Sequence, residues 1–102
     1  MKPLEISALG PGRPPIDAAL DNTRRLEDVG FDALWYSDHF LHWFPPGVWT
    51  PDVTPLANLM KTPHVFVDPM VLMAAAGAQT ERIKFGTGVT DAIRRHPAVL
   101  AQ

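Results

Sequence analysis

Short apolar segments alternate with helix-like segments along the chain, and this order constrains the fold more than any other feature of the sequence. Three strands are predicted, at residues 4–9, 31–36 and 83–89. Helices are predicted to begin at prolines, which the first helical turn tolerates: Pro14-Pro15, Pro69 and Pro97. Alternating strands and helices predict parallel strands that are joined by right-handed crossovers.

The helices carry clear start and stop signals. Apolar residues recur at helical spacing from Ile16 to Leu26, and Gly30 follows as the predicted C′ residue. Asp68 is the predicted N-cap of a helix over residues 69–78, which is apolar nearly all round and is expected to be buried. The segment 31–36 lacks alternation, which indicates burial on both faces. Residues 40–67 form a long loop rich in proline and aromatic residues.

Three parallel strands cannot close a barrel, and a length of 102 residues supports at most one domain. A doubly wound sheet is the competing architecture, but it usually has a glycine-rich phosphate turn after its first strand. Here Pro11 and Pro14 remove backbone amides from that turn. We therefore infer an α/β fold, about three βα units from the N-terminal part of a TIM (β/α)8 barrel. Residues 1–102 are expected to be an incomplete N-terminal portion of the barrel domain, because the helix at Pro97 is cut short.

Composition excludes several classes of function. Nine Lys and Arg against eleven Asp and Glu give a net charge of −2, which argues against a nucleic-acid partner. The absence of cysteine excludes disulfides, zinc–thiolate sites and cysteine nucleophiles. The longest apolar run, residues 69–78, is shorter than the roughly 20 residues of a membrane span. With no visible signal peptide, we expect a cytoplasmic protein that has a small-molecule partner and no membrane partner.

Two polar clusters lie at the C-terminal ends of predicted strands, which is the barrel end where function gathers. Ser37-Asp38-His39 is the first, and Gly88-Val89-Thr90-Asp91 is the second. His39 can handle a proton or hydrogen-bond a developing charge. Alternatively, His39 caps the strand end and Asp38 holds a loop amide. Adjacent strand residues point in opposite directions, so Asp38 and His39 are not expected to form a simple dyad.

Other polar and aromatic groups each have a structural interpretation beside a functional one. Trp43 belongs to an aromatic group that can wall a planar ligand or simply pack the loop, together with Phe40, Phe44 and Trp49. Arg94-Arg95-His96 is interpreted as a solvated loop, with contact to an anionic cofactor tail as the alternative. The histidines lack the spacing of metal ligands, so no metal site is predicted.

Two segments resemble the bacterial luciferase-like monooxygenase superfamily. The first is residues 30–40 with Trp43, where Ser-Asp-His-Phe-x-x-Trp is similar to the coenzyme F420-dependent oxidoreductases of that superfamily. The second is residues 80–91, followed by Arg94-Arg95-x-Pro-Ala-Val. Its Val-Thr-Asp-Ala-x-Arg-Arg pattern is most similar to phthiodiolone ketoreductase-like members.

This resemblance implies a TIM barrel and hydride transfer between an alcohol or carbonyl substrate and C5 of a deazaflavin. It implies that Asp38 hydrogen-bonds the cofactor, that His39 lies near the reacting centre, and that Trp43 faces the ring and the substrate. It also places a non-proline cis peptide at Gly88–Val89, in a bulge behind the deazaflavin. Asp91 lies where relatives often contact the cofactor.

Members of this superfamily also use a carboxylate after the fourth strand and a phosphate-binding region from later strands. The 102 residues stop before both, so this chain alone is expected to be inactive. The full-length protein is expected to be an oxidoreductase and a homodimer. One alternative is an FMN-dependent luciferase-like monooxygenase, since FMN supports oxygen chemistry and a deazaflavin does not. The other is an inactive barrel remnant or a nonenzymatic α/β module.

Overall fold

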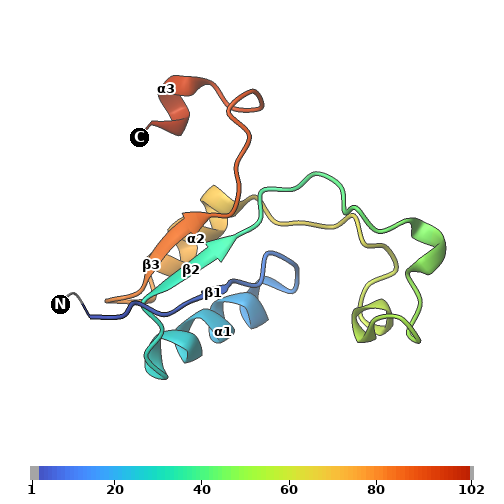
Figure 1. Ribbon diagram of the computed structural model, residues 1–102, viewed down its shortest axis with the longest axis horizontal. Coiled ribbons are helices and arrows are strands. Elements are labelled where there is room, and N and C mark those ends of the chain that lie inside the picture. Colours follow the sequence, from blue (N-terminus) through green and yellow to red (C-terminus); the bar gives the residue numbers. More distant parts are fainter. Residues whose placement is uncertain (1–2, 102) are drawn as a thin grey trace.

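Three parallel strands form one sheet in the order β1-β2-β3, as the alternation of elements predicts (Figure 1). The computed structural model describes residues 3–101. No helix in that range is long and apolar enough to cross a membrane. The elements, with η marking 3₁₀ helices, are β1 (Ser7–Leu9), α1 (Ile16–Asp28), β2 (Ala33–Tyr36), η1 (Pro46–Val48), η2 (Pro55–Asn58), α2 (Pro69–Gly77), β3 (Lys84–Thr87) and α3 (Pro97–Leu100).

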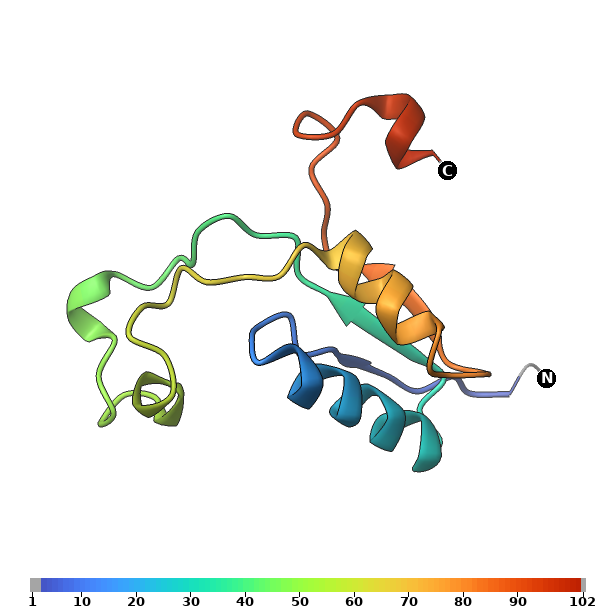
Figure 2. The same ribbon diagram turned by 180° about the vertical axis from the view of Figure 1, so that it is seen from behind.

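Helices α1 and α2 lie side by side on one face of the sheet and contact each other (Figure 2). Consecutive strands are neighbours, so each crossover moves one strand along the sheet in the same direction. A doubly wound sheet instead reverses direction and places helices on both faces. Sequential strands with helices on one face are the arrangement of a barrel wall.

The core lies between the sheet and the two helices. Leu34 and Tyr36 of β2 are fully buried against Ala19 of α1 and Leu72 of α2. The Tyr36 hydroxyl is 2.7 Å from Oγ1 of Thr23, which itself donates to a backbone carbonyl of α1. The buried phenol therefore has a partner, and β2 is fixed against α1.

The opposite face of the sheet is bare in the described part of the chain. Trp35 points to this face and is 43% exposed, and its register partner Leu9 is also exposed. The next partner is Gly86, where a Cβ atom would lie 2.5 Å from the Trp35 ring. The prediction that residues 31–36 are buried on both faces is therefore wrong for the described chain. The apolar row of the interior face has no covering layer here.

The strands are shorter than predicted. β1 starts at Ser7 and not at residue 4, because the Asp32 carboxylate accepts the hydrogen bond of the Ile6 amide at 2.8 Å. β3 covers four residues, because its partner β2 has only four. Helix α2 was expected to be buried all round, yet Val71 is exposed, because only the side of the helix that faces the sheet and α1 is covered.

The helix ends follow the predicted signals. One oxygen of Asp68 accepts hydrogen bonds from the amides of Met70 and Val71, at 2.9 and 3.2 Å, so Asp68 is the N-cap of α2. Gly30 follows the end of α1 with φ of 97°, a left-handed conformation that glycine adopts most easily.

Glu27 joins the last turn of α1 to the start of β3. Its carboxylate accepts hydrogen bonds from three successive amides, those of Glu81, Arg82 and Ile83, at 3.0, 2.6 and 2.8 Å. Chiefly because the Arg82 and Ile83 amides favour its charged form, the pKa of Glu27 lies below its ordinary value, although burial opposes this. No local pattern in the sequence predicts that Glu27 is buried, because its hydrogen-bond partners lie 54 to 56 residues away.

We predict that Gly10→Ala destabilises the protein by about 1–3 kcal/mol, because the new Cβ overpacks a filled core. That Cβ would lie 2.4 Å from the buried Tyr36 ring. Gly47→Ala is the matched control, since no heavy atom lies within 4 Å of its Cβ position. Urea unfolding of both variants checks the prediction, and equal midpoints would contradict it.

We also predict that Glu27 makes stability depend on pH on the acid side. Its pKa is lower in the folded state, so its contribution is complete above its ordinary pKa and is lost as the pH falls through the folded value. Glu27→Gln, which does not titrate, should flatten this part of the profile. Thermal unfolding between about pH 3 and pH 7 spans the titration of a carboxyl group. An unchanged acid slope in the variant would refute the assignment.

Candidate active site

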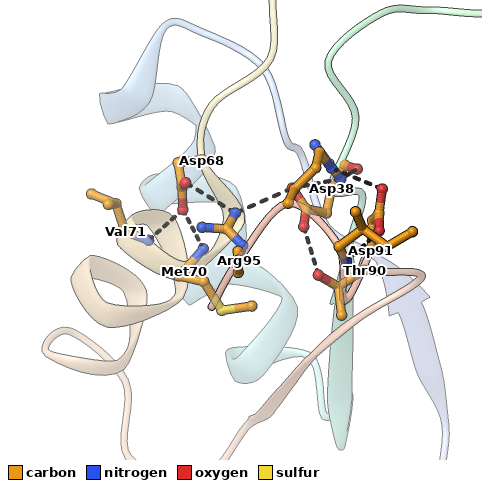
Figure 3. Close-up of polar contacts among 9 residues, drawn as sticks. Asp38, Asp68, Met70, Val71, Thr90, Asp91 and Arg95 are labelled. Atoms are coloured by element: carbon orange, nitrogen blue, oxygen red, sulfur yellow. Dashed lines mark hydrogen bonds and ion pairs between the residues drawn. The ribbon is translucent and has the colours of Figure 1, made fainter. Parts of the chain in front are cut away.

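Asp38 lies just beyond the carboxyl end of β2, and its side chain is 4% exposed. Oδ2 accepts a hydrogen bond from the Thr90 hydroxyl at 2.6 Å, and Oδ1 accepts one from Arg95 at 3.2 Å (Figure 3). Both partners come from the segment between β3 and α3. The buried carboxylate thereby joins the ends of two neighbouring strands.

Arg95 lies between two carboxylates. Its Nη2 atom donates to Asp38 and also to Oδ2 of Asp68, the latter at 3.0 Å (Figure 3). Asp68 is already the N-cap of α2, so this one guanidinium links the end of β2, the segment after β3 and the start of α2. Its Nε atom is buried and has no hydrogen-bond partner among the described residues.

Burial opposes the ionisation of Asp38 and Asp68, but their partners outweigh it. For Asp38 the hydrogen bonds from Thr90 and Arg95, with the positive charges of Arg95 and Arg94, hold the pKa below its ordinary value. The pKa of Asp68 is likewise lowered by its two amide donors and by Arg95. The Arg95 pKa is raised by the hydrogen bonds to both carboxylates. The cluster is therefore fully ionised near neutral pH.

Arg94 also turns inward. It donates to the backbone carbonyl of Asp38, and its Nη2 atom is 3.3 Å from that residue's carboxylate. Its Nε atom is 3.4 Å from Asp91, and its guanidinium lies 4.6 Å from the centre of the Phe40 ring. The interpretation of Arg94-Arg95-His96 as a solvated loop is therefore wrong for both arginines. Three carboxylates, those of Asp38, Asp68 and Asp91, contact these cations, and the Phe40 ring lies against one of them. Only the tertiary fold brings Asp38, Asp68 and Phe40 close to the arginines.

Two pockets adjoin this cluster at the carboxyl end of the sheet. The first, which we call the Asp38 pocket, has a volume of about 260 Å³ and is lined by Asp38, His39, Phe40, Phe66, Val67, Asp68, Pro69, Arg94 and Arg95. The second, which we call the Arg13 pocket, has a similar volume and is lined by Arg13, Ser37, His39, Leu41, His42, Trp43 and Phe66. His39 and Phe66 line both pockets, so the His39 side chain lies between them.

His39 and Asp38 do not form a dyad. Asp38 is buried and His39 is exposed, as expected of adjacent residues that point in opposite directions. His39 packs against Phe66, with ring centres 5.4 Å apart. The structure thus brings together in the Arg13 pocket the two residues predicted to be catalytic, His39 and Trp43. Their roles, and the cofactor contact of Asp38, stay predictions.

Trp43 belongs to an aromatic cluster within the long loop. Its ring stacks on Phe44 at 4.4 Å and on His42 at 5.5 Å, yet it is 78% exposed. His42 also stacks on Phe66, which lies near the other end of the loop. Phe40, assigned to this group from the sequence, instead lies under Arg94. Trp43 therefore presents a largely open indole face at the pocket.

The remaining predicted site residues lie on the segment after β3. The Gly88–Val89 peptide bond is cis, as the resemblance implies. The Gly88 amide donates to the Tyr36 carbonyl at 2.9 Å, and Val89 is largely exposed beside Thr90. Asp91 is exposed and accepts a hydrogen bond from the amide of Ile93 at 2.7 Å. Neither pocket includes these predicted cofactor-binding residues, and their binding role stays a prediction.

Sequence reasoning missed three residues of the site. Arg13 lines one pocket and donates to the Pro63 carbonyl at 2.8 Å. Phe66 separates the two pockets, and Asp68 binds Arg95 in addition to capping α2. Only Asp68 gave a signal in the sequence, as an N-cap. Arg13 and Phe66 lie in irregular segments, where no periodicity shows which way a side chain points.

The chain matches the family model described as luciferase-like monooxygenase over residues 3–102. The chain belongs to the luciferase-like monooxygenase family. Members fold as TIM barrels, and the parallel α/β sheet seen here is consistent with that fold. No solved structure matches the chain significantly.

Several curated relatives carry coenzyme F420 in their names. An F420-dependent glucose-6-phosphate dehydrogenase of Intrasporangium calvum is 37% identical over 84 residues, which cover 81% of this chain and 20% of the relative. One of Amycolatopsis mediterranei is 35% identical over 79 residues, 76% of this chain and 19% of the relative. A phthiodiolone/phenolphthiodiolone dimycocerosates ketoreductase of Mycobacterium sp. (strain JLS) is 29% identical over 101 residues, 92% of this chain and 27% of the relative. The chain thus spans about a fifth to a quarter of the length of these relatives.

We predict that Asp38→Asn destabilises the protein by about 2–4 kcal/mol, because it removes the buried carboxylate that Arg94 and Arg95 share. Each partly buried arginine then keeps only one, more exposed counter-charge, that of Asp91 or Asp68. Asp91→Asn is the matched control. It makes the same chemical change on an exposed residue that also contacts Arg94, and its effect should stay within about 0.5 kcal/mol. Chemical denaturation measures both. Equal losses in the two variants would show that burial of the Asp38 carboxylate is not what matters.

Proposed function

We propose that this chain is the N-terminal portion of a coenzyme F420-dependent oxidoreductase. The proposed reaction transfers a hydride between the deazaflavin and an alcohol or carbonyl substrate. Membership of the luciferase-like family and the F420-dependent relatives support this assignment. The observation that carries it is the position of His39 between two pockets at the carboxyl end of a parallel sheet.

The fold part of the proposal is that β1-α1, β2-α2 and β3-α3 are the first three βα units of an eight-unit barrel. The sequential strand order and the position of α1 and α2 on one face of the sheet support it. The exposed row of Trp35 and Leu9 also supports it, since these side chains would face the barrel interior. The small share of each relative that this chain covers is consistent with such a portion.

The residues present fit one wall of a site for a planar, polar ring. The open indole face of Trp43 offers a flat apolar contact, and His39 offers a hydrogen-bonding group beside it. Gly88 has no side chain, so the exposed strand end at Gly88–Val89 gives close access to the backbone. Bound F420 would supply the hydride chemistry at C5 of its deazaflavin ring.

The chain's own contribution is placement and proton handling. His39 is exposed to the Arg13 pocket, where its imidazole can exchange a proton with the oxygen of an alcohol or carbonyl. Asp38 has its carboxylate oxygens engaged by Thr90 and the arginines, so in our proposal its main effect is to fix the backbone that carries His39. Trp43 would limit the space in which the substrate lies.

The test is a fluorescence titration with F420 and with FMN, in reduced and oxidised forms, on the product of the complete reading frame that contains these residues. Tight F420 binding without FMN binding is the expected result. FMN binding with oxygen consumption would move the assignment to the flavin monooxygenases. Binding of neither cofactor would favour an inactive barrel remnant or a nonenzymatic module.

We predict that His39→Ala lowers kcat by about 10²–10⁴-fold, the usual range for loss of a general acid or base, and changes F420 affinity much less. His96→Ala is the control, because His96 lies outside both pockets. Steady-state kinetics and F420 titration of the same preparations separate the two effects. A loss confined to cofactor affinity would assign His39 to binding and not to proton transfer.

Two further proposals concern the whole protein. Residues 1–102 alone should show no turnover, because a single wall does not enclose the reacting atoms, and turnover by this piece would overturn that view. The complete protein is proposed to be a homodimer, which light scattering on the purified protein tests.

A further inference from the structure

Arg13 is a partly buried cation that has no counter-charge in the part of the chain that the structure describes. Among residues 3–101, no carboxylate forms an ion pair with it, whereas Arg94 and Arg95 each contact two. Arg13 is only partly exposed, and this burial lowers its pKa. A desolvated cation without an anion is costly, and such groups gather at functional sites.

The known partners of Arg13 use only part of its guanidinium. Nη1 donates to the Pro63 carbonyl at 2.8 Å, and the guanidinium lies 4.3 Å from the centre of the Phe66 ring. Trp49 is a more distant aromatic neighbour at 5.6 Å. In the described chain, Nε and Nη2 donate no hydrogen bond and are not buried orphans. These donors are therefore free for a ligand.

The Arg13 pocket has the composition of an anion site. It contains no Asp or Glu, whereas the adjoining Asp38 pocket contains two carboxylates that the arginines neutralise. Besides Arg13, it offers the Ser37 hydroxyl and His42. Nδ1 of His42 accepts the Phe44 amide at 2.9 Å, which leaves the proton of a neutral ring on Nε2. Burial and the nearby charge of Arg13 lower the pKa of His42, in keeping with that neutral form.

We propose that Arg13 binds an oxyanion of the substrate, a carboxylate or a phosphate, in the pocket that also contains His39 and Trp43. This inference rests on the proposed function, because it treats that pocket as the substrate site. It narrows the substrate to a hydroxy or oxo compound that carries an anionic group close to its reacting carbon. Phe66 and Trp43 supply apolar contacts for the substrate's carbon atoms between its anionic group and its reacting carbon.

The alternative explanation is that Arg13 has only a structural role. It holds the end of the long loop through Pro63 and Phe66, next to a 2.9 Å hydrogen bond from the Val67 amide to the Gly12 carbonyl. If Arg13 had only this structural role, the pocket would bind neutral and anionic ligands equally well. The charge of the ligand is therefore the variable that separates the two explanations.

The experiment titrates the full protein with benzoate, inorganic phosphate and neutral benzamide, and follows tryptophan fluorescence, because Trp43 lines the pocket. The variant is Arg13→Gln. Arg24→Gln is the control, since Arg24 pairs with Asp21 on the exposed side of α1. We expect benzoate or phosphate to bind the wild type and the control equally, and to bind Arg13→Gln at least about tenfold more weakly. Binding by only one of the two anions distinguishes a carboxylate site from a phosphate site.

Two results overturn the proposal: anion affinity that Arg13→Gln leaves unchanged, or benzamide binding as tight as benzoate binding.

If Arg13→Gln loosens the loop, the wild type gives a second measurement. Phenylglyoxal modifies accessible arginines, and mass spectrometry reports the rate at each site. The bound anion should protect Arg13 at least about tenfold and leave Arg24 unprotected. Equal modification of Arg13 with and without the anion also overturns the proposal.

F420 titration of the same preparation separates this inference from the proposed function. If F420 binds but anion affinity does not depend on Arg13, the anion site is refuted and the proposed function is not. If anion affinity depends on Arg13 but F420 does not bind, the proposed function is refuted and the anion site is not.

Discussion

Two arginines and a threonine converge on the buried carboxylate of Asp38, and the geometry of the candidate site depends on this convergence. Asp38 lies just beyond the end of β2, while its partners lie on the segment after β3. Arg95 extends the link to Asp68 and so to the first turn of α2 (Figure 3). A carboxylate taken out of water needs such partners, and here they fix three segments that carry the site. The next residue, His39, is placed by the same backbone.

At the opposite end of the sheet, a second buried carboxylate joins α1 to the start of β3. Glu27 accepts three backbone hydrogen bonds where the chain enters β3, and Asp38 receives its donors where the chain leaves it. β3 is four residues long, and its outer edge has no partner strand in the described chain. Fixed ends compensate for a short edge strand, because they hold its register against β2. The two carboxylates thus determine where Gly88 and Val89 lie relative to β2.

The long loop between β2 and α2 is ordered by contacts among its own aromatic residues and by one arginine. His42, Trp43 and Phe44 stack on one another, and His42 also stacks on Phe66. Arg13, from the turn after β1, covers Phe66 and binds the Pro63 carbonyl. The loop thereby becomes the wall of the Arg13 pocket and not a solvated excursion from the sheet. The length of the loop was evident from the sequence, but no local pattern indicated its contact with Arg13.

The sequence by itself determined the features that depend on a few consecutive residues. Proline in the first turns, Asp68 as an N-cap and Gly30 after α1 set the helix ends, and alternation set the parallel sheet. The strand-end position of Asp38 and His39 followed from the same pattern. Tertiary structure decided the contacts that join distant segments, such as Arg95 with Asp38 across 57 positions. It also decided that Glu27 is buried and that Trp35 is exposed, because burial depends on which element packs against a face, and no local spacing encodes that neighbour.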